Sequence, residues 1–311
     1  DADDDLIFGD NGRINLTPVR GPEETPVFGE SAPTLLESVL SIHIDTGGVE
    51  TISAGSDADS VFGGFGGDTI YGDDATGSSF VLDDADTLIG DNGQIDFIEG
   101  QVSHIFTTDT SEATGGADQI SAHAGNDIIL GGVNGSSDVL AGGNGNDIIL
   151  GDNGELIYDD ATDPDTSTLD IIRSFVDGLG GADNITGNAG SDIIIGGTSG
   201  DTLYGDDATA SAGSADLGDF ILGDNGDFIL TDNAIATIET TDVNDLHETY
   251  GGADSISGNA GDDVILGGVN DGGVDAIQGN AGLDVILGDN GFLAYNSLTD
   301  PDLATLDYVS T

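Results

Sequence analysis

Glycine, polar and aliphatic positions recur along this chain with a period of nine residues. The clearest run starts at Gly178 and reads GLGGADNIT, GNAGSDIII and GGTSGDTLY. In each unit the first five positions are rich in glycine, the sixth is Asp and the eighth is Ile, Leu or Val. Such a unit predicts a tight turn followed by a three-residue strand, with the eighth residue facing inward and its polar or small neighbours facing outward.

The sixth-position aspartates keep this phase through most of the sequence. Two units complete one coil, so successive coils are expected to stack as parallel strands about 4.8 Å apart. Glycine at this density and the lack of a 3.6-residue pattern argue against helix, which makes the expected fold class all-β. This sixth position, called the Asp slot below, is occupied by Asp5, Asp59, Asp68, Asp86, Asp118, Asp127, Asp138, Asp147, Asp183, Asp192, Asp201, Asp219, Asp254, Asp263, Asp275 and Asp284.

A longer period divides the chain into modules of about 70 residues. The tetrapeptide Gly-Asp-Asn-Gly marks their boundaries at residues 9–12, 90–93, 151–154, 223–226 and 288–291. It follows an Asp and an aliphatic triplet, as in Asp147-Ile-Ile-Leu. The modules are expected to span residues 13–93, 94–154, 155–226 and 227–291, with the end of a truncated module at 1–12 and the start of another at 292–311.

After each tetrapeptide the Asp slot is lost and a segment of alternating strand character follows. These segments, residues 13–46, 94–114, 155–179 and 227–250, predict β-hairpins that leave the stack, because their lengths vary while the repeats keep phase. The aspartate of each tetrapeptide either caps the last metal ion of its block or closes an Asx turn. The residues concerned are Asp10, Asp91, Asp152, Asp224 and Asp289.

The charge balance is extreme, with 60 Asp and Glu against three Arg and no Lys, for a net charge of −57. This excludes nucleic acid and anionic membranes as direct partners. No apolar run is long enough to span a bilayer, so membrane insertion is not expected. The absence of cysteine excludes disulfides, iron–sulfur clusters and thiolate zinc sites. Because the sequence has neither Met nor a signal peptide, we expect it to begin inside a longer or processed chain.

The stacked aspartates require a counter-charge. Like charges about 4.8 Å apart repel by roughly 1 kcal/mol per pair in water and by about 3 to 4 kcal/mol at an effective dielectric constant of 20. Ca²⁺ takes six to eight oxygen ligands, so carboxylates of two stacked Asp with main-chain carbonyls of the turns suit it. Mg²⁺ demands octahedral geometry and zinc prefers His or Cys. The ladder therefore predicts several calcium ions, held by the slot aspartates together with Asp152, Asp224 and Asp289.

The repeat resembles the RTX (repeats-in-toxin) family, whose nonapeptide is G-G-x-G-x-D-x-U-x. Residues 63–71, GGFGGDTIY, and residues 142–150, GGNGNDIIL, match it at every defined position. The resemblance implies a right-handed parallel β-roll, calcium between stacked turns and export from a bacterium. It does not imply toxin activity, since such repeats also occur in adhesins, surface-layer proteins and secreted enzymes.

Some units depart from the pattern. Glu50 replaces Asp in one slot, and Gly77 and Ala210 leave the slot without a carboxylate, so these sites are expected to be weak or empty. Asp73, Asp74, Asp206 and Asp207 either supply carboxylates from another turn position or form solvated loops. The repeated Asp-Pro-Asp at residues 163–165 and 300–302 is interpreted as a turn, with a second calcium site as the alternative.

The sequence favours a structural function over catalysis. His43, His104, His123 and His247 lie in different modules, and no metalloprotease, nucleophile-elbow or P-loop motif is present. We expect an extracellular or cell-surface rod, rigidified by calcium, that forms a filament, sheath or surface layer by self-association or by continuation of the same array. The alternatives are the extender of a large adhesin and, less favoured, the secretion and folding tail of an exported enzyme or toxin.

Overall fold

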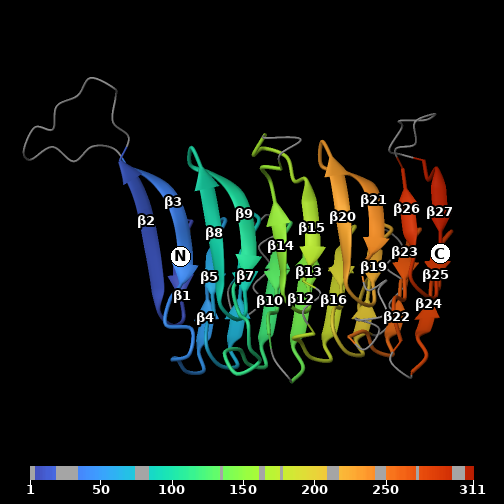
Figure 1. The fold of residues 1–311 in the computed structure, drawn as a ribbon, viewed down its shortest axis with the longest axis horizontal. Coiled ribbons are helices and arrows are strands. Elements are labelled where there is room, and N and C mark those ends of the chain that lie inside the picture. Colours follow the sequence, from blue (N-terminus) through green and yellow to red (C-terminus); the bar gives the residue numbers. More distant parts are fainter. Residues whose placement is uncertain are drawn as a thin grey trace, which may run out of the picture.

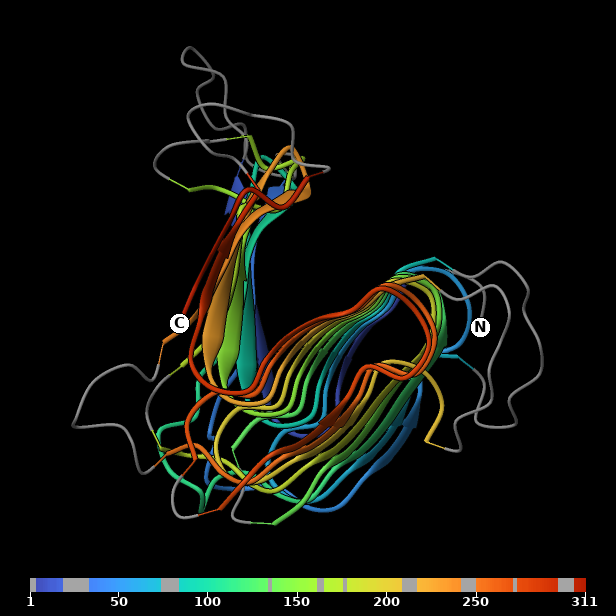
Figure 2. The ribbon, with the colours of Figure 1, turned by 90° about the vertical axis from the view of Figure 1, so that its right-hand side faces the viewer.

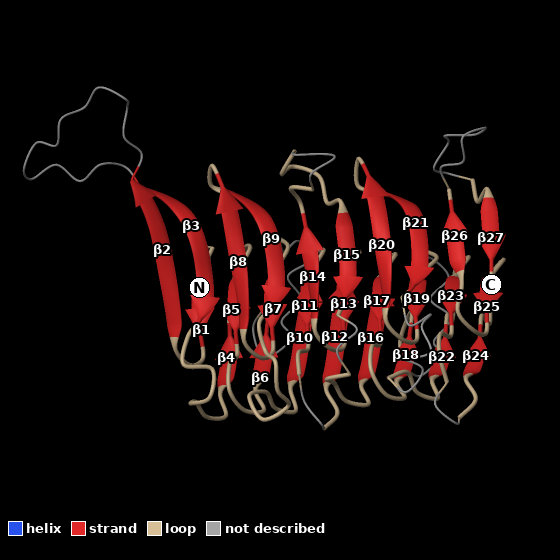
Figure 3. Cartoon of the chain, viewed as in Figure 1, coloured by secondary structure: helices blue, strands red, loops and turns tan. Residues whose placement is uncertain are grey.

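The computed structural model describes residues 4–18, 34–73, 84–133, 136–160, 165–175, 178–208, 217–241, 250–270, 273–295 and 305–311. Within these ranges the chain forms strands and turns but no helix (Figure 3). These described residues accordingly include no helix that could cross a membrane. Three sheets run along the long axis of the molecule, and strands from successive parts of the sequence follow one another along that axis (Figure 1).

Two of the sheets are parallel and form the roll. The central sheet orders β1 (Leu6–Phe8), β5 (Ser60–Phe62), β7 (Thr87–Ile89), β11 (Ile128–Leu130), β13 (Ile148–Leu150), β17 (Ile193–Ile195), β19 (Phe220–Leu222), β23 (Val264–Leu266) and β25 (Val285–Leu287). The outer sheet orders β4 (Thr51–Ser53), β6 (Thr69–Tyr71), β10 (Gln119–Ala124), β12 (Val139–Asn144), β16 (Asn184–Ala189), β18 (Thr202–Tyr204), β22 (Ser255–Ser257) and β24 (Ala276–Gln278).

The eighth residues of the repeat fill the interior of the roll, as expected. Ile129, Ile149 and Ile194 stack in register on the central sheet, and each is fully buried. Leu140 and Ile185 do the same on the outer sheet and belong to the same apolar cluster. Two nine-residue units therefore make one coil, and the all-β parallel roll expected from the sequence is confirmed.

The segments between repeat blocks build a third, antiparallel sheet, the flanking sheet. It orders β2 (Gly12–Pro18), β3 (Thr34–Ser41), β8 (Gly93–Ile98), β9 (Gln101–Thr107), β14 (Gly154–Ile157), β15 (Ile171–Ser174), β20 (Gly226–Thr231), β21 (Ala234–Thr240), β26 (Phe292–Ala294) and β27 (Tyr308–Ser310). Seen along the roll, this sheet stands at an angle to the stacked coils (Figure 2).

The expected hairpins do leave the parallel stack, but they are not separate projections. Each pairs with the hairpin of the next module, through β3 with β8, β9 with β14, β15 with β20 and β21 with β26. An isolated hairpin would expose unpaired backbone along both edges, and this pairing satisfies it. Each expected module thus gives two strands to each of the three sheets.

The central sheet is buried on both faces, which corrects the expectation that polar or small residues flank the eighth position. Leu150 and Leu222, at the ninth position, pack in one cluster with Leu156, Ile172 and Phe228 of the flanking sheet. All three consecutive residues of such a triplet are apolar because these strands face apolar layers on both sides. Of the two parallel sheets, the outer one follows the expected alternation, as in the pattern of β10 and β12.

Two expected repeat units are described only in part. The units that start at Gly72 and Gly205 follow β6 and β18, and the structure describes residues 72–73 and 205–208 of them. The substituted positions themselves, Gly77 and Ala210, lie outside the described residues, as does Asp74.

Candidate metal sites in the aspartate ladders

The aspartates before the central strands form one continuous ladder. The backbone N–H of Asp147 donates to Oδ1 of Asp192 in the next coil at 2.8 Å, and the N–H of Asp192 donates to Oδ1 of Asp219 at 2.9 Å. The same bond, 2.6 to 3.2 Å long, links Asp5, Asp59, Asp86, Asp127, Asp147, Asp192, Asp219, Asp263 and Asp284 in order. One oxygen of each accepting carboxylate thereby fixes the spacing between coils.

A second ladder precedes the strands of the outer sheet. Its bonds, 2.6 to 3.0 Å long, link Glu50, Asp68, Asp118, Asp138, Asp183, Asp201, Asp254 and Asp275. Glu50, which departs from the repeat, stands at the start of this ladder and takes part through its backbone N–H. The substitution therefore leaves the ladder intact.

The second carboxylate oxygens point into the turns. The Oδ2 atoms of Asp118, Asp183 and Asp201 are buried and have no hydrogen-bond partner. A Cβ placed on Gly196 would collide with both Asp201 Oδ2 and the carbonyl oxygen of Gly223 in the next coil. Carboxylate and carbonyl oxygens thus converge beside a position where only glycine leaves them room.

Burial makes these carboxylates hard to ionise without a counter-charge. Loss of water contact raises the pKa of Asp118 to about 8 and that of Asp147, Asp183 and Asp254 to about 7. It also raises the pKa of Asp201 well above its ordinary value, with further contributions from the neighbouring carboxylates. A bound cation would remove this penalty by stabilising the charged form.

The donor set selects the kind of cation. Within the described ranges, no three His, Asp or Glu side chains gather closely enough to hold a metal by side chains alone. An ion in the turns must therefore also use main-chain carbonyls, which provide hard oxygen ligands in a flexible arrangement. This donor set fits Ca²⁺ and suits zinc poorly.

Comparison with protein families agrees with this chemistry. The model of the RTX calcium-binding nonapeptide repeat matches residues 44–76, 107–134, 133–155, 177–208, 241–272 and 269–291, which is more than half of the chain. The chain belongs to the RTX calcium-binding repeat family. RTX repeats bind several calcium ions and are typical of secreted bacterial proteins. A search of curated proteins finds no match.

In this RTX roll, the expected ligands occupy three kinds of place. The slot aspartates of internal coils, such as Asp127 and Asp183, are buried in the turns. Asp5, Asp275 and Asp284 belong to the terminal coils and are half-buried. Asp289 is exposed at the last turn, so the structure does not bring it into a ladder.

The tetrapeptide aspartates bond to distant turns of the roll. Asp152 is 3 % exposed; its Oδ1 accepts the N–H of Gly181 at 3.0 Å and its Oδ2 accepts that of Thr198 at 2.6 Å. The Oδ1 of Asp224 accepts the N–H of Gly252 at 3.0 Å. These bonds span 28 to 46 residues, so the side chains do more than close a local Asx turn.

Sequence reasoning missed a buried contact beside the tetrapeptide. Asp109, 5 % exposed, accepts hydrogen bonds from the backbone N–H and from Nδ2 of Asn92 at 3.0 and 3.1 Å. It holds the turn between the central and flanking sheets. The Asn of the tetrapeptide is the signal that could have revealed it, because a buried amide requires partners.

The aspartates that directly follow β6 and β18 differ from one another. Asp73 and Asp206 are buried, and Asp206 Oδ2 accepts the N–H of Ala260 at 2.8 Å. Asp207 is exposed. Asp165 accepts the N–H of Ser167 at 3.1 Å, which is the turn expected there, whereas Asp163 and residues 300–302 lie outside the described residues.

Proposed function

We propose that this RTX chain is an extracellular structural rod that calcium rigidifies and that contributes to a filament, sheath or surface layer. The observation that supports it is continuity: within the described ranges, every named strand belongs to one of three sheets that run the length of the molecule (Figure 1). Each module repeats the same contribution of strands. A fold built in this way can be extended indefinitely without a new kind of contact.

Calcium would restrict folding to the cell exterior. The net charge of −57 and the buried ladder carboxylates oppose folding where calcium is scarce. Extracellular calcium modules bind with dissociation constants of about 10⁻⁴ to 10⁻³ M, far above cytosolic calcium. The chain would therefore remain unfolded until export and become rigid afterwards.

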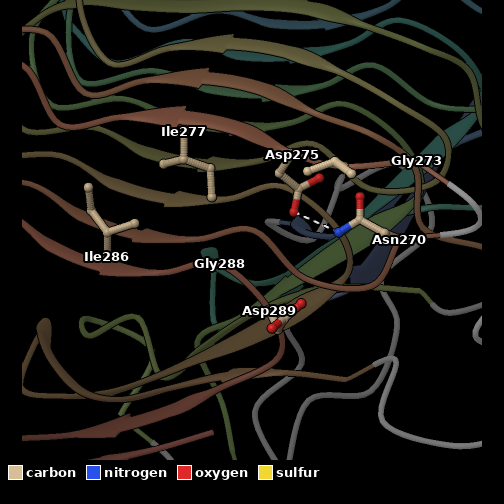
Figure 4. Close-up of a pocket in the computed structure, with 8 residues that line it drawn as sticks. Asn270, Gly273, Asp275, Ile277, Ile286, Gly288 and Asp289 are labelled. Atoms are coloured by element: carbon tan, nitrogen blue, oxygen red, sulfur yellow. Dashed lines mark hydrogen bonds between the residues drawn. The ribbon is translucent and has the colours of Figure 1, made fainter.

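We include homotypic association or continuation of the same array in the proposal, because the last described coil exposes apolar side chains that internal coils bury. Ile286 is 44 % exposed, whereas its equivalents Ile265 and Ile221 are fully buried. Ile286 and Ile277 line an open hollow at this end, beside Asp275, whose carboxylate accepts a hydrogen bond from Asn270 at 2.8 Å (Figure 4). A stacked coil of the same kind, such as that of a second copy, would cover them.

Electron microscopy of the purified chain, with 5 mM calcium or with excess EDTA, tests this function. We expect rods that associate end to end or side by side in calcium and that disappear in EDTA. Compact particles in calcium, monomeric by light scattering over a hundredfold range of concentration, would overturn it.

The extender of an adhesin is the second candidate, because the same continuous sheets would set a distance between a cell and a terminal binding domain. Rods that form in calcium but stay monomeric would favour it over the filament. The proposal assigns no catalysis to the chain. His104 contacts Glu155 at 2.9 Å and His123 stacks on Tyr71, roles that need no substrate.

A further inference from the structure

The aspartates of the Gly-Asp-Asn-Gly turns lie outside the nonapeptide ladders, yet their side chains turn back toward the roll. Asp91 shows this best because it is completely buried. Its Oδ1 accepts the N–H of Gly116 at 2.9 Å. Its Oδ2 is also buried and has no hydrogen-bond partner. Burying a carboxylate oxygen without a hydrogen-bond partner costs folding free energy unless a cation or a proton binds to it.

This oxygen points at an outer-ladder turn that already contains two carboxylates. A Cβ placed on Gly132 would lie 2.6 Å from Asp91 Oδ2, and one placed on the adjacent Gly131 would lie 2.9 Å from Asp138 Oδ2. A Cβ on Gly90 would collide with Asp118 Oδ2 and would lie 2.5 Å from the carbonyl oxygen of Gly131. Three carboxylates and a main-chain carbonyl therefore lie against three neighbouring glycines, Gly90, Gly131 and Gly132.

The neighbouring carboxylates also act on Asp91 through their charge. Burial is the main cause that raises the pKa of Asp91 well above its ordinary value, and the charges of Asp118, Asp109 and Asp138 raise it further. The carbonyl oxygen of Val133 also lies near Asp91 Oδ2, since a Cβ on Gly115 would collide with both oxygens. The surroundings of Asp91 Oδ2 are thus rich in oxygen and poor in positive charge.

The arrangement recurs once in each module. Asp224 Oδ2 lies against Gly268, beside Gly267, which is flanked by Asp275 Oδ2, and Val269 again supplies a carbonyl oxygen. Asp152 lies against Gly180 and Gly197, and its charge raises the pKa of Asp201. Asp10 lies against Gly47 and Gly64, and its charge raises the pKa of Asp68. The placement is shared by all four junctions and argues for a common role, although Oδ2 of Asp152 also accepts the N–H of Thr198 at 2.6 Å and Oδ2 of Asp10 that of Phe65 at 2.7 Å.

We propose that Asp10, Asp91, Asp152 and Asp224 each supply a further carboxylate to a calcium ion of the outer ladder, giving every module one junction site. Affinity for calcium rises with the number of anionic ligands. The junction sites therefore fill at lower calcium than the two-carboxylate sites elsewhere in the ladders. Each also joins the start of a flanking hairpin to the roll. The three carboxylates are not drawn together as a cluster in the structure, so binding must contract the turn around the ion.

Calcium counting on single variants of the full chain tests the assignment. We expect Asp91→Asn and Asp224→Asn each to lose one tightly bound ion in equilibrium dialysis and to raise the lowest calcium midpoint severalfold in circular dichroism. Asp232→Asn is the matched control: it removes the same charge from the exposed tip of the β20–β21 hairpin, and both measurements should stay unchanged. Unchanged ion number and midpoint in both junction variants would overturn the proposal.

A crystal structure of the unmodified chain in calcium decides the matter if the variants do not fold. An ion about 2.3 to 2.6 Å from Asp91 Oδ2 and from an outer-ladder carboxylate is expected. Outer-ladder ions that leave Asp91 uncoordinated would refute the assignment. The inference rests on the calcium binding of RTX repeats and not on the filament, so junction sites in a chain that never assembles would leave it standing.

Discussion

At the scale of single residues, a slot aspartate inside a ladder combines two features that a short carboxylate provides. One oxygen accepts the N–H of the preceding coil, as Asp192 does from Asp147 at 2.8 Å, while the other faces the turn. Asn could provide the first feature but carries no charge for calcium. Glu50 is tolerated because it starts its ladder and accepts no ladder bond in the described chain.

Removing one slot aspartate should therefore have two effects. Asp192→Ala leaves the N–H of Asp147 unpaired in a buried place, which costs about 1 to 3 kcal/mol of unfolding free energy. It also weakens the calcium sites on either side of Asp192, so the calcium midpoint rises. Urea unfolding at saturating calcium, with circular dichroism detection, measures the loss. Asp165→Ala, in an exposed turn, should leave stability nearly unchanged.

The glycines at the first position of a turn provide a matched pair. A Cβ on Gly196 would collide with a carbonyl oxygen and a carboxylate, whereas a Cβ on Gly288 would meet nothing within 4 Å. Gly196→Ala should destabilise the roll by about 1 to 3 kcal/mol through overpacking and should remove calcium from that turn. Gly288→Ala should be close to neutral in the same urea and calcium titrations. Equal effects of the two changes would show that turn space is not what selects glycine.

At the scale of elements, the two apolar layers are separable. Phe228 is fully buried between the central and flanking sheets, edge-on to Phe220 at a ring distance of 6.4 Å. Phe228→Ala should cost about 3 to 5 kcal/mol. Hydrogen exchange should increase first in β15, β20 and β21, while the ladder strands stay protected. Ile229→Ala, on the opposite face of β20, is the control and should leave exchange in the flanking sheet nearly unchanged.

The roll could be predicted from the sequence because its information is local. A nine-residue period fixes the turn, the inward residue and the ladder, so Asp183 and Ile185 fall where the pattern requires. The pairing of hairpins is not local. His104, Glu155, Arg173 and Asp227 form a row across β9, β14, β15 and β20, with Arg173 bonded to Asp227 at 3.0 Å and to Glu155 at 3.3 Å.

Nothing in the spacing of that row indicates that these residues meet. The clue to the flanking sheet is that the aliphatic triplets place apolar residues on both faces of the central strands. Such strands require a second apolar layer over the central sheet. The ion pair between Arg173 on β15 and Asp227 on β20 joins consecutive modules, so one of the three Arg side chains stabilises pairing between modules. The hydrogen bond from His104 on β9 also joins two modules and lowers the pKa of Glu155 on β14. Sequence patterns specify elements well, and they specify contacts between equivalent elements poorly.

At the scale of the whole molecule, the ladders give the roll a direction. Every ladder bond runs from a backbone N–H to the carboxylate of the following coil, so one end of a stack offers acceptors and the other offers donors. Copies that associate through their ends would therefore do so head to tail, which gives an open filament instead of a closed dimer.

The response to pH without calcium follows from the buried carboxylates. Burial raises the pKa of Asp118 to about 8 and those of Asp147 and Asp183 to about 7, from an ordinary value of 3.8. At a pH between the ordinary pKa of 3.8 and these raised pKa values, the folded chain binds more protons than the unfolded chain. The free energy of unfolding without calcium therefore falls as the pH rises through this range. In EDTA, circular dichroism should show more β-structure at pH 5.5 than at pH 8, both above the isoelectric point of about 4.1.

Calcium should reverse this dependence. Its ligands must be ionised, so protons compete with the metal, and the calcium midpoint should rise as the pH falls from 8 to 5.5. Titrations at both pH values, with Asp232→Asn as a control for net charge, separate the ladder from general repulsion. A β-signal in EDTA that is equally low at both pH values, together with a pH-independent calcium midpoint, would mean that the ladder carboxylates do not govern folding.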